Sequence, residues 1–451
     1  MSALSAKERG KVALWQIKKV LHCHFPDLSL RLSALSDPRK GVQYTIEEIL
    51  MAAVVSFLLK CSSRNAFNLK SKDKQFRQNY YRMFRLGLPH MDAVNELLEK
   101  MDTEAFEALR CRLLSSLIEK RVVHRLRFFS KYFCVAVDAT GAYQWGDTPP
   151  EAIRAHALKK VSASGKTTYF SLVLEAVLIC SNGMSIPLMS EWVANDGQQY
   201  DKQDCELKAF KRLAVRMKNY FPRLPICILA DGLYTNVALM DICKQYQWQF
   251  IVVFKDGNLP SVWEEVNSLL PLERNNTSQQ TSCDSTWWYA NHYQWVNDIE
   301  YQKHNIHWVK CACENQHRKT GEKKNNKFVF LTSMKVERQN VVSILSAGRA
   351  RWNIEDHFNT QKNRGGELHH KFNRVNFNAV KNWHNIRQLA TLIGELVEFS
   401  AEMQSLKNQI PKMTWKEIWE NLNSLLIMCP IEEVIVEFEH CSSAKRQVRL
   451  E

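Results

Sequence analysis

The stretch from residue 126 to residue 256 constrains the fold most, because apolar runs and amphipathic runs follow one another in a definite order. Apolar, β-rich runs predict strands, and a period near 3.6 residues predicts helices. The order is strand, strand, strand, helix, strand, helix, strand, at residues 132–138, 168–180, 184–193, 201–220, 226–231, 236–246 and 250–254. Three strands that reverse direction, followed by crossovers, predict an α/β fold with a mixed sheet.

Two of these predicted strands end in an acidic residue. The run 132–137 leads into Asp138, and the run 225–230 leads into Asp231. Right-handed crossovers would place the first and fourth strands side by side, with the two aspartates adjacent. Open α/β sheets carry their sites at the carboxyl ends of strands, so both acids are candidate site residues. Each aspartate also suits a turn or a helix cap.

A third acid lies on a predicted helix far along the chain. Residues 351–362 show helical spacing of apolar residues, with Trp352 among them, and no glycine or proline occurs before positions 365 and 366. Arg351 precedes Glu355 by one turn, and Lys362 follows Glu355 by about two turns, so the three side chains share one face. A solvated surface helix with ion pairs would show the same pattern.

Three converging carboxylates would favour a particular chemistry. Oxygen ligands are those that Mg²⁺ prefers, and neighbouring carboxylates repel one another unless cations lie between them. Arg351 suits phosphate by its planar fork, and Lys362 suits it as a point charge. If Asp138, Asp231 and Glu355 converge, the predicted chemistry is metal-assisted phosphoryl transfer on nucleic acid.

These residues resemble the DDE transposases of the insertion-sequence-four class. That class has the signature Tyr-x2-Arg-x3-Glu-x6-Lys around its glutamate, and Arg351, Glu355 and Lys362 match it. Stretches 36–50, 202–206 and 362–371 are also similar to such enzymes, so the resemblance covers most of residues 30–400. One departure is plain, because Gly348 stands where the family has a tyrosine that helps to position DNA.

The resemblance implies an RNase H-like catalytic core in which Asp138, Asp231 and Glu355 bind two Mg²⁺ ions, for which Mn²⁺ can substitute. Arg351 and Lys362 would bind the DNA phosphates. The implied function is cut-and-paste DNA transposition, in which a homodimer binds terminal inverted repeats and target DNA. Two alternatives stay open: an RNase H-like nuclease without strand transfer, and a decayed protein that only binds DNA.

The expected domain organisation follows from both lines of reasoning. A β-rich insertion between the second aspartate and the glutamate is a feature of the resembled class, and residues 257–327 are rich in polar and aromatic residues. The expected parts are a helical DNA-binding region at 1–125, the first part of the core at 126–256, the insertion at 257–327, the second part of the core at 328–400 and a helical region at 401–451.

Other side chains rank lower as site residues. Asp147, Glu175 and Glu191 are rival acids, of which two lie in predicted strands and could face solvent. The resemblance allows an insertion tryptophan to stack on an everted base, but packing in a small sheet is the alternative. A zinc site is disfavoured in the insertion because 306–313 alternates as a strand does. The tryptophans concerned are Trp287, Trp288 and Trp295, and the zinc-type residues are His304, His307, Cys311 and Cys313.

Composition agrees with this interpretation without proving it. A formal charge of +14 and a pI near 9.1 favour a polyanionic partner. Bases and aromatics are interleaved in residues 64–85, which suits a phosphate backbone or a solvated helix with core aromatics. Thirteen cysteines, an odd number, predict the reduced bacterial cytosol, with association to the nucleoid when DNA is bound. The longest apolar run, 49–59, is too short to span a bilayer.

Overall fold

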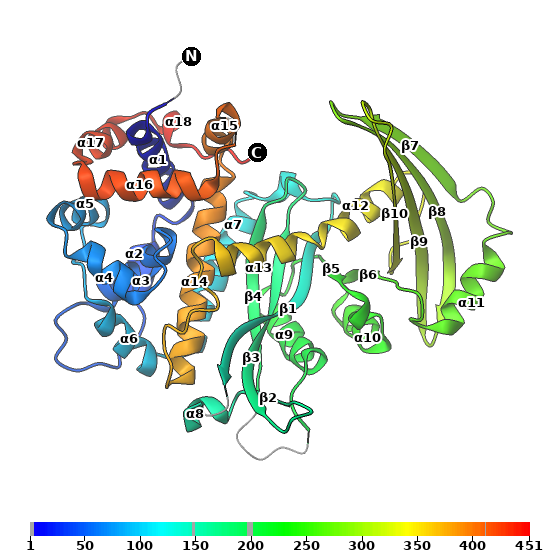
Figure 1. Cartoon of the computed structure of the whole chain (residues 1–451), viewed down its shortest axis with the longest axis horizontal. Helices are drawn as coiled ribbons and strands as arrows, with labels where there is room; N and C mark the ends of the chain where they lie inside the picture. Colours follow the sequence, from blue (N-terminus) through cyan, green and yellow to red (C-terminus); the bar gives the residue numbers. More distant parts are fainter. Residues whose placement is uncertain (1–3, 147–148, 196–201, 411) are drawn as a thin grey trace.

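The computed structural model describes residues 4–146, 149–195, 202–410 and 412–451. Ten strands form one mixed sheet in the order β2-β3-β1-β5-β6-β10-β9-β8-β7, and β4 pairs with the outer side of β3. Helices gather at one end of the molecule and the strands β7–β10 lie at the other (Figure 1). The predicted α/β class, with a mixed sheet and helical terminal regions, is therefore confirmed.

The N-terminal region is helical up to the first strand. Capping boxes start two of its helices, formed by Ser5 with Glu8 at the start of α1 and by Thr45 with Glu48 at the start of α3. Each pair satisfies backbone N–H groups at the helix N-terminus. The elements are α1 Ala6–His24, α2 Leu28–Ser33, α3 Ile46–Leu58, α4 Arg64–Ser71, α5 Lys74–Phe84, α6 Met91–Lys100, α7 Thr103–Glu119 and η1 His124–Leu126.

The C-terminal helices pack onto this region. Helix α14 is buried along nearly its whole length and contacts α3, α6, α7 and β4, while α16 packs on α1. The two ends of the sequence therefore build one helical body that flanks the sheet (Figure 1). The elements are α14 Phe377–Glu398, α15 Ala401–Gln409, α16 Trp415–Met428, α17 Glu432–His440 and α18 Ser443–Arg446.

The central strands and helices follow the order that the sequence predicts, with α8 and β2 added. Strand β5 reads Ile-Cys-Ile-Leu-Ala and is buried throughout, as a covered strand with a continuous apolar run should be. It pairs in parallel with both β1 and β6, which confirms that the first and fourth predicted strands are neighbours. The bounds are β1 Phe133–Gly146, α8 Glu151–Arg154, β2 Leu158–Val161, β3 Thr167–Ile179, β4 Ser185–Val193, α9 Glu206–Tyr220, β5 Ile226–Ala230, η2 Gly232–Tyr234, α10 Val237–Tyr246 and β6 Gln249–Val253.

The aromatic-rich segment extends the same sheet. Strand β10 pairs antiparallel with β6 at Phe330 and Val253 and also carries β9, β8 and β7. The predicted boundary between 327 and 328 consequently falls inside β10, because residues 323–327 already belong to that strand. The elements are α11 Pro260–Leu269, β7 Thr277–Cys283, β8 Trp287–Tyr301, β9 His304–His317 and β10 Lys323–Thr332.

Two short helices, α12 Val341–Ala350 and α13 Asn353–Asn363, follow the sheet. Helix α13 contacts β1, β3 and β4, so the helix that carries Glu355 lies against the central strands. Within the described ranges, no helix combines the length and apolar character that a membrane crossing requires.

Candidate active site

Asp138, Asp231 and Glu355 approach one another where β1, β5 and α13 meet. Strands β1 and β5 pair in parallel up to Ala136 and Leu229, and each aspartate lies two residues beyond its member of that pair. Glu355 lies in the first turn of α13. Asp231 and Glu355 line one pocket, and the guanidinium of Arg351 contacts both Asp138 and Glu355. Folding thus brings together acids that are far apart in sequence.

Asp138 does not end its strand as predicted. Strand β1 continues to Gly146, because its antiparallel partner β3 extends well beyond the end of its parallel partner β5. Asp138 therefore lies just beyond the point where β1 stops pairing with β5, and not at the end of β1 itself. Its carboxylate Oδ1 accepts the N–H of Ala139 at 2.9 Å, and its side chain is 25% exposed.

Asp231 also serves as a local cap. Its Oδ1 accepts the N–H of Leu233 at 2.8 Å and so caps the short helix η2. The carboxylate nevertheless lines a pocket of about 530 Å³ together with Glu355. Asp231 can therefore cap η2 and also present its carboxylate to the pocket.

Arg351 lies between two of the acids. Its Nη1 is 3.5 Å from Asp138 Oδ2 and its Nη2 is 3.1 Å from Glu355 Oε1. The residue is only 5% exposed, and its Nε has no hydrogen-bond partner among the described residues. Arg351 follows the end of α12 and forms, with Trp352, the turn into α13, so the helix predicted over 351–362 is confirmed from Asn353 onward and begins two residues later than predicted. The four-residue spacing to Glu355 still allows the ion pair.

Lys362 lies two turns further along α13, near a different acid. Its Nζ is 6.0 Å from the centroid of the Phe358 ring, and burial lowers its pKa while Glu175 opposes that shift. Its predicted phosphate contact stays a prediction.

Burial raises the pKa of Asp138, Arg351 opposes that rise, and Asp231 and Glu355 add to it. A further cation would relieve this repulsion. Carboxylates are also the ligands that Mg²⁺ prefers, so the donor set fits the ion in kind. Among the described residues, however, no three His, Cys, Asp or Glu side chains lie close enough to hold a metal ion as they stand. Arg351 separates Asp138 from Glu355, and metal binding would require it to move.

The pocket beside the acids contains residues that sequence reasoning did not select. Lys255 and Lys327 line it, one after β6 and one in β10, and Trp352 is 56% exposed at its edge. The helical spacing counted Trp352 among its apolar positions, but the turn between α12 and α13 leaves its side chain exposed. Its position between the two charged residues of the signature was the available signal. Nothing local distinguished Lys255 from other basic residues, whereas Lys327 ends the lysine-rich run 323–327.

Glu206 is a fourth acid near the site, at the start of α9. The hydroxyl of Tyr234 donates to Glu206 Oε1 at 2.7 Å. Burial raises the pKa of Glu206, and the charges of Asp138 and Asp231 raise it further. The family-like stretch 202–206 ends at this residue, which was the signal in the sequence.

Gly348, which occupies the family's tyrosine position, has a packing role. A Cβ at this position would lie 2.8 Å from the Phe330 ring, a distance that real Cβ atoms do not adopt. Helix α12 therefore rests directly on β10 because residue 348 has no side chain. In this packing, a tyrosine side chain at position 348 would overlap the Phe330 ring.

The rival acids have structural partners. Glu175 is fully buried, so the expectation that it could face solvent was wrong. Glu191 pairs with Arg212 at 2.8 Å and also with Arg216. Asp147 lies outside the described residues.

The three candidate tryptophans of the insertion differ in exposure, and the four candidate zinc ligands have other contacts. Trp295 is 4% exposed in a core cluster, which excludes it from base stacking, whereas Trp288 is 52% exposed beside Arg318. Trp287 is half-buried, with Lys324 Nζ 4.9 Å from its ring centroid. The sulfur atoms of Cys311 and Cys313 are 3.4 Å apart, whereas His304 pairs with Asp241 and His307 accepts the N–H of Asp298.

Comparison with known families matches part of the N-terminal helical region. Residues 30–113, less than half of the chain, match the family model described as DDE_Tnp_1-associated. The segment runs through most of the N-terminal helical region, from α2 into α7, and excludes the acidic site. No curated protein matches the sequence. The domain match indicates a protein related to the DDE-type transposases.

Proposed function

We propose that this protein is a DNA transposase of the insertion-sequence-four class with an RNase H-like core. The observation that carries the proposal is the convergence of Asp138, Asp231 and Glu355 from β1, the end of β5 and α13. The strand order β4-β3-β1-β5-β6, antiparallel for the first three strands and parallel for the last three, supports the RNase H-like assignment. The matched N-terminal domain supports the transposase assignment.

The three carboxylates would hold two Mg²⁺ ions, or Mn²⁺ in their place. Bound there, the ions would activate the attacking water or DNA 3′-hydroxyl and stabilise the leaving oxygen. The protein's own contribution is to hold Asp138 and Asp231 on paired strands, where their separation is set by the sheet. Glu355 completes the set from a helix that packs on the same strands.

Arg351 would pair with the carboxylates when no metal is bound and with a DNA phosphate when metal is bound. In this structure its guanidinium neutralises Asp138 and Glu355. Metal binding would free it for the adjacent phosphodiester, which its planar fork suits. Lys255 and Lys327 line the same pocket and would hold neighbouring phosphates, with Lys362 further along α13.

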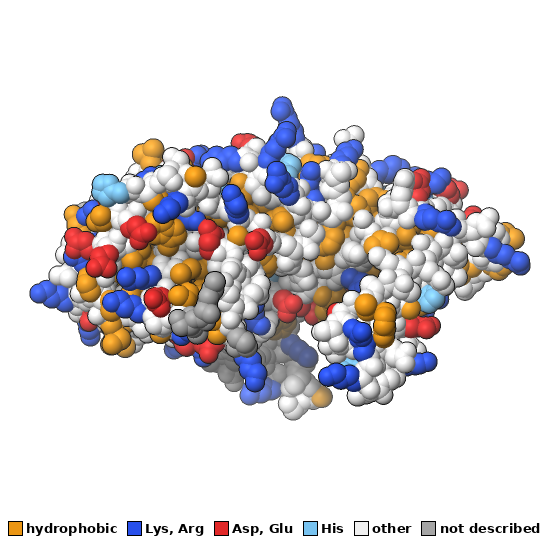
Figure 2. Space-filling view, turned by 90° about the horizontal axis from the view of Figure 1, so that it is seen from above, with side chains coloured by type: hydrophobic (Ala, Val, Ile, Leu, Met, Phe, Trp, Pro, Cys, Tyr) orange, Lys and Arg blue, Asp and Glu red, His pale blue; other side chains and the backbone are white. Residues whose placement is uncertain are grey.

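The substrates would be the terminal inverted repeats of the element and target DNA, bound by a homodimer in the bacterial cytosol. Lys and Arg side chains are spread over the face shown in Figure 2, among acidic ones. The formal charge of +14 favours such polyanionic partners.

The direct test is to incubate the purified chain and Mg²⁺ with DNA bearing the ends that flank its gene. We expect excision and a joined product. Cleavage without joining would favour an RNase H-like nuclease, and end binding without cleavage would favour a decayed protein that only binds DNA.

Single substitutions test the acids. Asp138→Ala, Asp231→Ala and Glu355→Ala should each abolish cleavage, a loss of at least about a thousandfold, because a ligand of the ions is removed. Binding of the ends, measured by gel shift, should stay measurable. Substantial Mg²⁺-dependent cleavage by any of the three would show that the residue is misassigned.

A further inference from the structure

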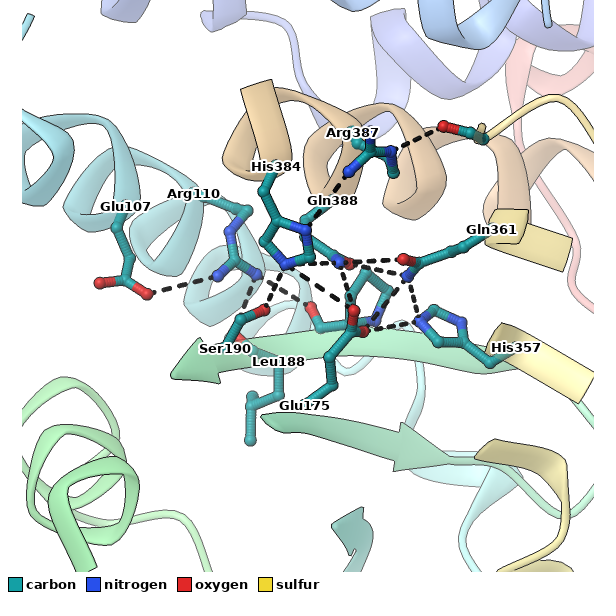
Figure 3. Close-up of polar contacts among 12 residues, drawn as sticks. Glu107, Arg110, Glu175, Leu188, Ser190, His357, Gln361, His384, Arg387 and Gln388 are labelled. Carbon is teal, nitrogen blue, oxygen red and sulfur yellow. Dashed lines mark hydrogen bonds and ion pairs between the residues drawn. The ribbon is translucent and has the colours of Figure 1, made fainter. Parts of the chain in front are cut away.

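A buried polar network lies on the inner side of the helix that carries Glu355. At its centre is the carboxylate of Glu175, on β3 (Figure 3). His357 Nε2 lies 3.2 Å from Glu175 Oε2, Gln361 Nε2 donates to the same oxygen at 3.2 Å, and Gln388 Nε2 donates to Oε1 at 2.9 Å. These four residues are at most 2% exposed.

The network and the candidate catalytic residue occupy opposite sides of α13. His357 follows Glu355 by two residues, which is about 200° around a helix. Glu355 therefore faces the pocket when His357 faces the interior. Gln361 lies one turn after His357 and contacts the same carboxylate, so two successive turns of the helix are attached to β3.

The same strand pair carries both the anchor and a candidate ligand. Glu175 is the direct register partner of Asp138 in the antiparallel pair of β3 and β1. Directly opposite side chains lie on the same face of a sheet. The link from α13 to Asp138 is therefore short: α13 is hydrogen-bonded to Glu175 on β3, and Glu175 lies opposite Asp138 on the neighbouring strand β1.

Helix α14 fixes the network from the other side. Gln388 also contacts His384, whose Nε2 lies 3.1 Å from Ser190 Oγ on β4. Arg387 Nε donates at 2.6 Å to the carbonyl of Gly366, in the loop that follows α13. A Cβ on Gly366 would lie 2.6 Å from the carbonyl oxygen of Gln361, so only glycine permits this close return of the chain. Both the body and the end of α13 are thus tied to α14.

Apolar packing would hold α13 with less directional precision. Burying a carboxylate is costly unless its oxygens are satisfied, and here both oxygens accept hydrogen bonds. Burial alone would raise the pKa of Glu175, but hydrogen bonding with His357 and Gln361 brings it below its ordinary value. Hydrogen bonds depend on angle as well as distance, so this arrangement fixes rotation of the helix as well as its depth.

We propose that Glu175, His357, Gln361 and Gln388 form a positioning set that holds α13 so that Glu355 faces Asp138. This inference rests on the proposed function only for the role of Glu355. None of the four residues lines the pocket that Asp231 and Glu355 share. Their contribution to catalysis acts through the placement of Glu355.

The test compares Glu175→Gln with the exchanged pair E175Q/Q388E. The single variant places an amide donor at position 175 against the donors around it, whereas the exchanged pair returns a carboxylate to the network from position 388 on α14. We expect Glu175→Gln to lower the single-turnover cleavage rate by about tenfold or more while the affinity for DNA ends changes by less than about twofold. Amides of residues 353–363 should exchange hydrogen faster. The exchanged pair should recover part of the cleavage rate and part of the protection of these amides against hydrogen exchange.

Glu398→Gln is the matched control. Glu398 is also a buried carboxylate of α14, and it accepts the indole N–H of Trp419 at 2.7 Å, outside the network. Glu398→Gln should leave the cleavage rate and the hydrogen exchange of residues 353–363 as in the parent chain.

Gln388→Leu, which removes one donor and keeps the Glu175 carboxylate, serves as a second variant if Glu175→Gln does not fold.

The outcomes separate the inference from the proposed function. If the parent chain does not cleave DNA, the proposed function fails, and hydrogen exchange in 353–363 still decides whether the network positions α13. Unchanged exchange and rate in Glu175→Gln or Gln388→Leu would overturn the inference. Equal losses in Glu398→Gln would also overturn it, because the effect would then be a general loss of stability.

Discussion

At the scale of single residues, Arg351 changes the interpretation of the signature around Glu355. The sequence pattern suggested a phosphate contact, whereas the structure places the guanidinium between Asp138 and Glu355. Both descriptions concern one planar cation that can pair with either carboxylate or phosphate. The choice between them depends on what else neutralises the acids.

Arg351→Gln tests this balance without DNA. Removing the cation should lower the free energy of unfolding by about 1–2 kcal/mol, a modest value because Asp138 and Glu355 are partly solvated. Mg²⁺ should restore part of this stability, since it can replace the guanidinium. Urea unfolding with and without Mg²⁺ measures both effects, and Arg349→Gln on the exposed side of α12 is the control. Equal stability of variant and parent would contradict the bridging role.

At the scale of elements, the contact between α12 and β10 explains the glycine at position 348. Gly348→Tyr should destabilise the fold by about 2 kcal/mol, because the side chain would overlap Phe330. Thermal unfolding measures the loss. Combining it with Phe330→Ala should recover part of it, and no recovery would show that the strain lies elsewhere.

Helix α14 carries a second, half-buried acid, Glu395, whose titration affects stability. Burial raises the pKa of Glu395 to about 7, and Glu398 adds to the rise, while the carboxylate accepts the N–H of Ser185. The folded state then binds a proton that the unfolded chain has lost, so this group's stability contribution is present near pH 4.5 and is lost as pH rises to about 7.

Glu395→Gln should therefore remove part of the decline in stability between about pH 5 and pH 7.5. Urea unfolding at both pH values measures the difference. Glu420→Gln, at an exposed position of α16, should leave the decline as it is in the parent chain. A parallel pH profile for Glu395→Gln and the parent would contradict the burial of this carboxyl.

At the scale of the whole molecule, the continuous sheet connects the insertion to the candidate site. Because β10 pairs with β6, it delivers Lys327 to the pocket that Lys255 reaches from the end of β6. Lys255, after β6, and Lys327, in β10, therefore lie in the same pocket as Asp231 and Glu355. This arrangement predicts a salt-dependent contribution of both lysines to DNA binding.

Lys255→Ala and Lys327→Ala should each weaken DNA binding and reduce the slope of log affinity against log salt by about one. Fluorescence anisotropy over a range of salt concentrations measures this slope. Lys120→Ala, exposed at the end of α7, is the charge-matched control. An unchanged slope in both pocket variants would place the DNA elsewhere.

The sequence by itself determined the elements and the candidate acids. Apolar runs such as 226–230 indicate a buried strand, because hydrophobic periodicity is a local property. Parallel neighbours β1 and β5 followed from the handedness of crossovers, which brought Asp138 and Asp231 to one edge. The spacing of Arg351 and Glu355 predicted their contact for the same local reason.

Only the tertiary structure decided what these residues face. Glu175 is buried because α13 and α14 cover β3, and Gly348 is needed because Phe330 approaches α12. Trp352 is exposed because the chain turns at 351–352, where the periodicity suggested that the helix had already begun. Each of these outcomes depends on contacts between segments distant in sequence, and side-chain periodicity within one segment carries no information about its partners.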